Sequence, residues 1–272
     1  PQIERLSTLI DIDCCNLSQG LNNFVGVPGV TPTTLTTYGQ AMVKLDNMAA
    51  PQEDRKFFLN PAADFTLMDN LKGLFNAGRE ITRQYESGSM TKGGTLNAAW
   101  FKDQSIYSQT IGALGASTPI VSVSPVSGAT TITTTGWVTG TLNAGDIVSF
   151  ISATTPVNGI NPQNYQTTGE PMQFAVAATT SDAGGTLTIP IGPAIIGPGQ
   201  QLQNVTNLPA TNTPVYVYNT AATSFSSIAS VSTPQNMYVH RDFGTLAMVD
   251  MPLPGGTDKA YRASSRKSGK SI

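Results

Sequence analysis

The chain has 272 residues, enough for one or two domains with a buried core, and a globular hydrophobic content of 39%. Charged residues make up only 12% and the net charge is −2, so composition gives no electrostatic case for dedicated nucleic-acid binding. The adjacent pair Cys14 and Cys15 provides neither a disulfide framework nor a metal-ligand set, and we expect two small buried residues on a helix. No apolar run reaches the length that spans a bilayer.

The N-terminal part of the chain predicts two helices. Apolar residues recur at helical spacing from residue 3 to residue 21, and a glycine- and proline-bearing turn follows. The same spacing predicts a second helix over residues 35–45. Thr33 or Thr34 is its expected cap, and Pro51 is its expected stop.

A strand and a third helix are predicted next. Residues 56–59 are predicted as a strand, Asn60 as a helix cap and Pro61 as the first helical residue. Gly78 is expected to end this helix. Its buried face is expected to consist of four apolar residues: Phe65, Met68, Leu71 and Phe75.

The most unusual stretch lies between Lys102 and Arg241 and contains no basic residue. It is rich in Thr, Ser, Gly, Asn and β-branched residues, which favour short strands and tight turns over helices. We predict an all-β module whose strands close into a small barrel, with the clearest pair, 174–178 and 187–191, joined by a turn at 182–185. Six strands are expected: 120–126, 130–135, 147–151, 174–178, 187–191 and 215–218.

The segments on either side of this module are expected to be mixed. A polar surface loop is predicted over 79–94 and a short strand around residues 100–101. After the module we expect a strand at 236–240, a short helix at 241–249 and a turn at 251–256, followed by a basic tail.

Candidate catalytic chemistry is sparse. His240 is the single histidine, and Asp242 lies close to it, but no nucleophile elbow accompanies them, so we predict a structural role. Asp146 is expected to serve a turn. We therefore predict no catalytic, cofactor-binding or metal-binding residues, no cofactor and no enzymatic activity. A hydrolase that uses His240, Asp242 and a serine is the less favoured alternative.

An ordered series of motifs in the chain resembles the major capsid (coat) proteins of tailed bacteriophages, of the short-tailed type with an inserted β-barrel domain. No single motif is specific, and the resemblance is carried by the order and spacing of the series. The motifs are Asn23-Phe24-Val25-Gly26, Asp54-Arg55, Phe58-Leu59-Asn60-Pro61, Trp100-Phe101, Gly145-Asp146, Asn236-Met237-Tyr238-Val239-His240-Arg241-Asp242 and Leu253-Pro254-Gly255-Gly256.

The resemblance implies an α+β protein with part of the tailed-phage capsid fold, in which the axial and peripheral core is interrupted by an all-β barrel insertion domain. It places a first part of the core at residues 1–111, the insert at 112–233 and a second part of the core at 234–272. Upstream arm and helix segments and later strands of the family are not matched, so the expectation is a fragment. Ion pairs within the family's insert have no basic partner here.

The resemblance further implies a structural protein that self-assembles into hexamers and pentamers of an icosahedral phage or prophage head. Its expected partners are further copies of itself, scaffolding and portal proteins, and packaged DNA through non-specific contacts, with no membrane. The expected location is the virion, after assembly in the bacterial cytoplasm. The alternative is a β-rich phage tail module, or one that binds a receptor or glycan.

Overall fold

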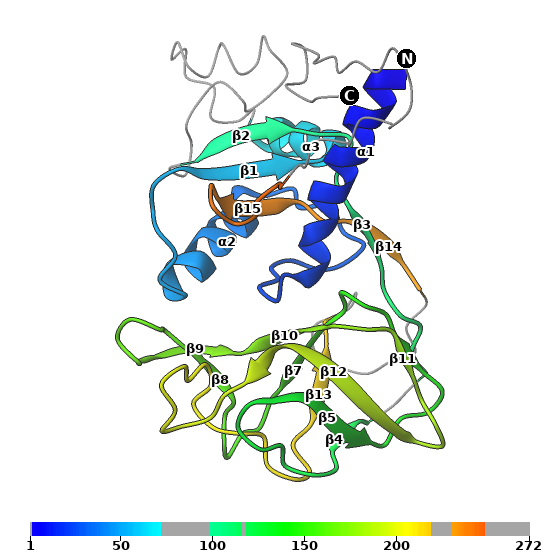
Figure 1. Ribbon diagram of the computed structural model, residues 1–272, viewed down its shortest axis with the longest axis vertical. Coiled ribbons are helices and arrows are strands. Elements are labelled where there is room, and N and C mark those ends of the chain that lie inside the picture. The colour runs from blue at the N-terminus through cyan, green and yellow to red at the C-terminus, as the bar shows by residue number, and fades with distance from the viewer. Residues whose placement is uncertain (1, 72–97, 116–117, 219–229, 248–272) are drawn as a thin grey trace, which may run out of the picture.

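The computed structural model describes residues 2–71, 98–115, 118–218 and 230–247, and it shows a mixed protein with few helices and many strands (Figure 1). The helices are α1 (Gln2–Asn16), the 3-10 helix η1 (Leu17–Gly20), α2 (Leu35–Asn47) and α3 (Pro61–Leu71). Among these residues, no helix combines the length and apolarity that a membrane crossing requires. The helices accompany one small sheet, and most strands lie in a separate lower part of the molecule (Figure 1).

The small sheet and helices α1 to α3 form what we call the body. Strand β1 (Arg55–Leu59) lies between β15 (Met237–His240), antiparallel to it, and β2 (Ala99–Lys102), parallel to it. Segments from both ends of the described chain therefore meet in one sheet. The sheet core is aromatic, because the Phe57 ring stacks on Trp100 at 4.2 Å and on Tyr238 at 4.0 Å between centroids.

The predicted junction between β1 and α3 is confirmed in detail. Asn60 caps the helix, since its side-chain oxygen accepts a hydrogen bond from the Ala63 N–H at 2.9 Å. The predicted buried face of α3 is wrong, however, because Phe65 is 73% exposed. The helix instead turns Ala63, Asp64 and Leu67 inward.

The orientation of α3 has a physical cause on the neighbouring strand. The Asp64 carboxylate lies 3.0 Å from the Lys102 ammonium of β2, and Leu67 packs into the aromatic cluster that contains Trp100. Phe65 follows Asp64 in the helix, about 100° further around its axis, so it points away from the sheet. Met68 does pack against the cluster as predicted, whereas Phe75, Gly78 and the Leu71 side chain lie outside the described part.

A two-stranded stem joins the body to a β-barrel. Strands β3 (Ser108–Thr110) and β14 (Ser232–Pro234) pair antiparallel, with Thr233 opposite Gln109. The barrel sheet has the order β13-β7-β10-β12-β5-β4, with all pairs antiparallel. These strands are β4 (Ile120–Val121), β5 (Ala129–Thr135), β7 (Ile147–Phe150), β10 (Gln173–Val176), β12 (Thr186–Ile195) and β13 (Val215–Val217).

Hydrogen bonds between the two edges of this sheet nearly close it. Ile120 forms a bridge with Pro214, and the Val121 N–H donates to the Thr213 carbonyl at 2.9 Å. A strand thus forms at each of the six predicted positions and the β10–β12 pair is confirmed, but the first strand ends at Val121 and not at residue 126, and the barrel is nearly closed. Two short pairs accompany the barrel: β6 (Thr141–Leu142) with β11 (Thr180–Ser181), and β8 (Asn158–Ile160) with β9 (Thr167–Pro171).

The barrel core is aliphatic where the body core is aromatic. Leu187, Ile189 and Ile191 share the inner face of β12 and are at most 3% exposed, as their alternation predicts. Phe150 and Phe174 are fully buried with ring centroids 5.8 Å apart. The barrel therefore has a continuous hydrophobic core of its own.

The C-terminal flank departs from prediction at one place. Strand β15 confirms the strand expected at 236–240, but residues 241–247 form a turn and an irregular stretch, not the start of a helix. The turn closes locally, because the Phe243 N–H donates to the His240 carbonyl at 3.1 Å and the Asp242 N–H to the imidazole. The loop at 79–94, the turn at 251–256 and the tail lie outside the described residues, and the domain boundaries at 111/112 and 233/234 stay predictions.

Candidate functional site: the junction between barrel and body

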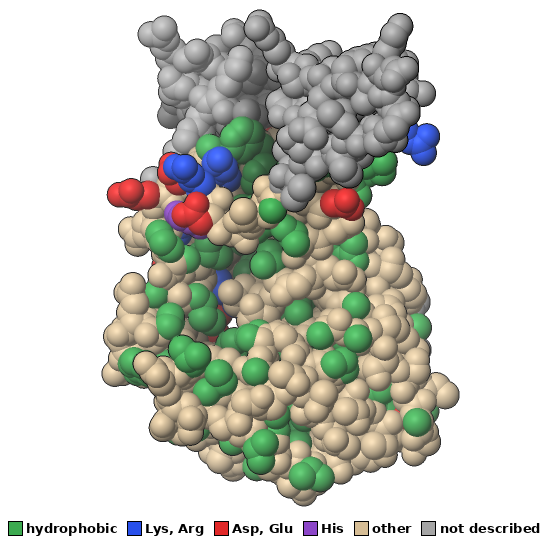
Figure 2. Space-filling view, viewed as in Figure 1, with side chains coloured by type: hydrophobic (Ala, Val, Ile, Leu, Met, Phe, Trp, Pro, Cys, Tyr) green, Lys and Arg blue, Asp and Glu red, His purple; other side chains and the backbone are tan. Residues whose placement is uncertain are grey.

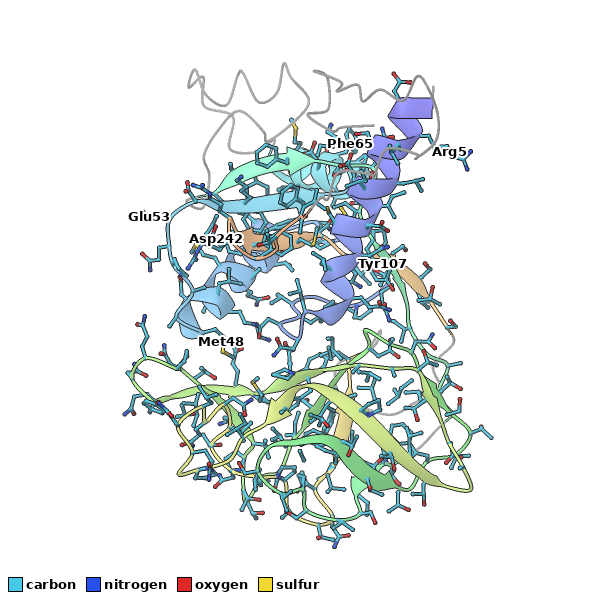
Figure 3. All side chains as sticks on the ribbon, in the orientation of Figure 1. Arg5, Met48, Glu53, Phe65, Tyr107 and Asp242 are labelled. Atoms are coloured by element: carbon cyan, nitrogen blue, oxygen red, sulfur yellow. The ribbon has the colours of Figure 1, made fainter. Side chains whose placement is uncertain are left out.

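His240, the one candidate for acid–base chemistry, is engaged in a local turn. Its Nδ1 accepts a hydrogen bond from the Asp242 N–H at 3.2 Å, and the Asp242 carboxylate lies 3.8 Å from the same nitrogen. Both partners come from the next turn of chain, and the Asp242 side chain is 78% exposed (Figure 3). The arrangement supports a structural role for this histidine at the end of β15.

The two cysteines differ in their surroundings. Cys15 is buried between α1 and the sheet, next to Met237 and Val239, whereas Cys14 is only partly buried. Burial, reinforced by nearby Asp103, raises the pKa of the Cys15 thiol to about 11. Such a thiol stays protonated at neutral pH and is a poor nucleophile. Among the described residues, no group of three or more His, Cys, Asp or Glu side chains has metal-binding geometry.

The chemically most organised region is the junction between the barrel and the body, and Asp146 lies at its centre. This carboxylate is 3% exposed and accepts hydrogen bonds from the backbone N–H groups of Gly112 and Asn143, at 3.0 and 2.8 Å, and from the Gln109 amide at 3.0 Å. Burial raises its pKa, and the three hydrogen bonds oppose the rise. Asp146 thus ties the stem strand to the turn between β6 and β7, which extends its predicted turn role.

Glycine is required beside this carboxylate. Gly145 has a φ of +90°, and a Cβ added there would lie 2.7 Å from the Gln109 side-chain oxygen and 2.8 Å from Cγ of Gln19. Because both glutamines approach Gly145 closely, both side-chain amides donate to the Ala144 carbonyl. The nitrogen–oxygen distance is 3.1 Å for Gln19 and 2.9 Å for Gln109. Helical, stem and barrel segments therefore meet at this turn.

A second contact joins the barrel to the body through Gln173 of β10. Its side chain is 3% exposed, and its oxygen accepts hydrogen bonds from the Phe24 N–H at 2.8 Å and from the Lys44 ammonium. Its backbone carbonyl accepts from the Asn22 amide at 3.0 Å. Lys44 also donates to the Phe24 carbonyl at 3.1 Å and lies 3.9 Å from Glu170.

Lys44 brings a nearly buried positive charge to the edge of the uncharged barrel. Its side chain is 12% exposed, and burial lowers its pKa to about 8 although Glu170 acts in the opposite direction. The absence of basic residues in the barrel sequence therefore does not leave Glu170 without an ion-pair partner. That partner comes from helix α2 of the body.

A cleft of about 170 Å³ lies between these two contacts, and the molecular surface is hollowed between the upper and lower parts (Figure 2). Its lining includes Gln109 and Asp146 from the stem side and Phe24 and Lys44 from the body. Met48, at the lower end of α2, packs against the barrel core beyond it (Figure 3). The two parts thus touch at separate points with open space between them.

Apolar side chains also lie exposed on the body. Phe65 on α3, which is labelled in Figure 3, is 73% exposed, and Phe101 on β2 is 41% exposed. Leu6 and Leu9 on α1 and Leu17 in η1 are between 42% and 52% exposed. Exposed apolar side chains are typical of protein interaction sites where they form a patch.

No protein-family model matches the chain, and no curated protein matches it. Among solved structures, the chain is similar to the CUS-3 coat protein I-domain, at 24% sequence identity and a TM-score of 0.25. The alignment covers 40% of this chain and 96% of that one. A TM-score of that size does not establish a shared fold.

Sequence reasoning identified Asp146 but missed Gln109, Gln173 and Lys44. One signal was available for Lys44, since it lies one turn from Ala41, on the face of the helix that also carries the apolar Leu45. The glutamines gave none, because a glutamine in a polar, charge-free segment does not differ from its exposed neighbours until the chain is folded.

Proposed function

We propose that this chain is a structural subunit of a protein shell, the coat protein of a tailed-phage head, and that it has no enzymatic activity. The observation that carries the proposal is the path of the chain. It runs through a charged α+β body, passes by a two-stranded stem into a barrel without basic residues, and returns to the body as β15 beside β1. This is the arrangement that the motif series implies for the coat proteins of short-tailed phages.

The surface of the body supports the same proposal. Shell subunits use one set of contacts repeatedly, so exposed apolar side chains on a rigid body are suited to the role. Phe65 projects from a helix that is fixed to the sheet by Asp64 and Leu67, so its position is rigid and not that of a loop. We propose further copies of the chain as the partner of this surface.

The other proposed partners follow from the resemblance alone. They are scaffolding and portal proteins during assembly and packaged DNA through non-specific contacts, and the proposed location is the virion. The described charges of the barrel are few and acidic, so the proposal assigns contact with DNA to the body and not to the barrel.

Electron microscopy of the full-length gene product, co-expressed with its neighbouring open reading frames, tests the proposal. Uniform shells or capsomer rings are expected. Dispersed particles at high concentration, together with measurable carbohydrate binding, would instead support the β-rich binding module.

A matched pair of variants tests the surface on α3. Phe65→Asp is expected to lower the yield of shells at least tenfold without lowering the melting temperature of the unassembled chain, because the ring is already exposed. Ala62→Asp adds the same charge at an exposed position of the same helix and is expected to assemble normally. Equal yields from the two variants would remove α3 from the proposed contact.

A further inference from the structure

The barrel and the body contact each other on two sides of the cleft, and the hydrogen bonds on the two sides differ in character. On the stem side, the β3–β14 ladder continues into the Ile111 N–H, which donates to the Val231 carbonyl at 3.0 Å, and into the three hydrogen bonds of Asp146. On the opposite side, α2 lies above the barrel (Figure 1). There the Gln173 side chain contacts Lys44 of α2 and Phe24 in the loop before it. The cleft separates the two points.

We propose that Lys44 and Gln173 form a latch that holds the barrel against the body, and that the barrel pivots about the stem when this latch opens. The inference concerns the chain itself and does not depend on its assembly into a shell.

Three groups form the latch and contact one another: the Gln173 side chain, the Lys44 ammonium and the Phe24 backbone. The Gln173 side-chain oxygen accepts from the Phe24 N–H and from Lys44, and Lys44 donates in turn to the Phe24 carbonyl. Phe24 thus uses both its backbone groups on partners from α2 and from the barrel. Removal of the Gln173 acceptor takes this partner from the Phe24 N–H and the Lys44 ammonium at once, so the two side-chain hydrogen bonds of the latch are lost together.

The latch is also the weaker of the two attachments. The Lys44 side chain is only 12% exposed, so its charge is largely shielded from water. Among the described residues, the one charged group that acts on its ammonium is Glu170 on β9, whose side chain is 55% exposed. The cost of dehydrating this charge opposes closure, and opening returns the ammonium to water. On the stem side the ladder is formed by backbone groups, and the one buried charge there, Asp146, accepts three hydrogen bonds that offset its dehydration.

This balance makes the opening of the latch depend on pH. Burial lowers the Lys44 pKa from 10.5 to about 8 in the closed state, whereas an open latch restores the ordinary value. Between pH 8 and 10.5 the closed state binds fewer protons than the open state, so closure is favoured as pH rises through that window. Below pH 8 the open state reaches its largest share, with an opening constant on the order of a hundredfold above that at pH 10.5.

Nuclear magnetic resonance of the whole chain tests the latch through three backbone amides and one side chain. In Gln173→Leu, exchange of the Phe24 amide is expected to accelerate at least tenfold. The stem amide of Ile111 and the barrel amide of Tyr218, which donates to the Ile147 carbonyl at 2.8 Å, are expected to keep their rates. The Lys44 pKa is expected to rise from about 8 toward 10.5.

A matched control is available in the exposed barrel residue Gln166. Gln166→Leu is expected to leave the Phe24 exchange rate and the Lys44 pKa unchanged. An unchanged Lys44 pKa in Gln173→Leu would overturn the latch, and equal acceleration at all three amides would overturn the pivot by showing that the stem opens as well.

A second variant covers the case in which Gln173→Leu does not fold. Lys44→Met removes the buried charge, so the pH dependence of Phe24 exchange between pH 7 and 9, corrected for the intrinsic rate, is expected to disappear. The same pH dependence in Lys44→Met and in the original chain would overturn the assignment to Lys44.

Discussion

The body and the barrel are stabilised by different physical means. The body places a charge in its core, since Arg55 is 3% exposed and lies 2.7 Å from Asp46 while it donates to the Pro51 and Ala50 carbonyls. The barrel has no basic residue and relies on a larger apolar core and on a nearly closed sheet. Burial of apolar surface responds little to salt or pH, whereas charged hydrogen bonds respond to both. The comparison predicts two parts that fail under different conditions.

The largest expected loss of stability comes from removing a buried aromatic ring, in one variant from the barrel core and in another from the body core. Phe174→Ala removes a fully buried ring from the barrel and is expected to cost about 3–5 kcal/mol of unfolding free energy, because the aliphatic walls around it do not collapse into the space. Trp100→Ala is its counterpart in the body, where the ring stacks on Phe57. Calorimetry that follows both variants is expected to show a different thermal transition lowered in each.

A single transition lowered equally by both substitutions would contradict this comparison. It would show that the contacts at Asp146 and Gln173 couple the barrel and the body into one cooperative unit.

The next effect tests the charged core of the body. Arg55→Met keeps much of the side-chain volume but removes the donors to the Ala50 and Pro51 carbonyls and leaves Asp46 without its partner. A loss of about 2–3 kcal/mol is expected, reduced from that of a fully buried pair because Asp46 is 34% exposed. Chemical denaturation measures it. A loss seen in the barrel transition and not in that of the body would contradict the assignment.

A smaller effect is expected at the junction, from Asp146→Asn. One amide oxygen accepts from Gly112 and Asn143, but the amide NH2 then faces the NH2 of Gln109, so one hydrogen bond is lost at a cost of about 1–2 kcal/mol. Asp182→Asn is the control, because its one hydrogen bond, from the Gly185 N–H at 2.8 Å, reaches a single oxygen that asparagine retains.

The cost of Asp146→Asn is expected to depend on pH. Burial raises the Asp146 pKa above its ordinary value, so the folded state binds more protons between the two values and its stability falls as pH rises through that window. The variant lacks this titration. Its deficit is therefore expected to be larger near pH 4 than near pH 7, and the opposite trend in denaturation at the two values would show that the hydrogen bonds outweigh burial.

The two parts also differ in how far the sequence predicted them. The positions of all six barrel strands followed from β-branched residues and turn signals, because in a chain segment with few charges the alternation of apolar residues is the main determinant of structure. In the body the same reasoning failed at Phe65. Its hydrophobicity predicted burial, but the helix is oriented by the pair of Asp64 with Lys102, a tertiary contact that no local pattern contains.

The candidate site was predicted only in part, for a related reason. Asp146 follows Asn143, Ala144 and Gly145 in a recognisable turn, so its role in that turn could be predicted from the sequence. The contact of Lys44 with Gln173 joins residues 129 positions apart, and no spacing rule connects them. The helix expected at 241–249 failed because His240 and Asp242 close a local turn that competes with helix formation.

The smallest loss of stability is expected from the exposed ion pair of Arg241 with Asp54, in contrast to the buried pair of Arg55 with Asp46. Arg241 lies 3.5 Å from Asp54, but both side chains are more than 60% exposed, so water and salt screen the pair. Arg241→Gln is expected to cost no more than about 0.5 kcal/mol in denaturation at moderate salt, far less than Arg55→Met although both remove an arginine from the body. A loss as large as that of Arg55→Met would mean that the position of a charge on the body, and not its burial, determines its contribution. The contrast between a charge-dependent body and a barrel without basic residues would then extend to the protein surface.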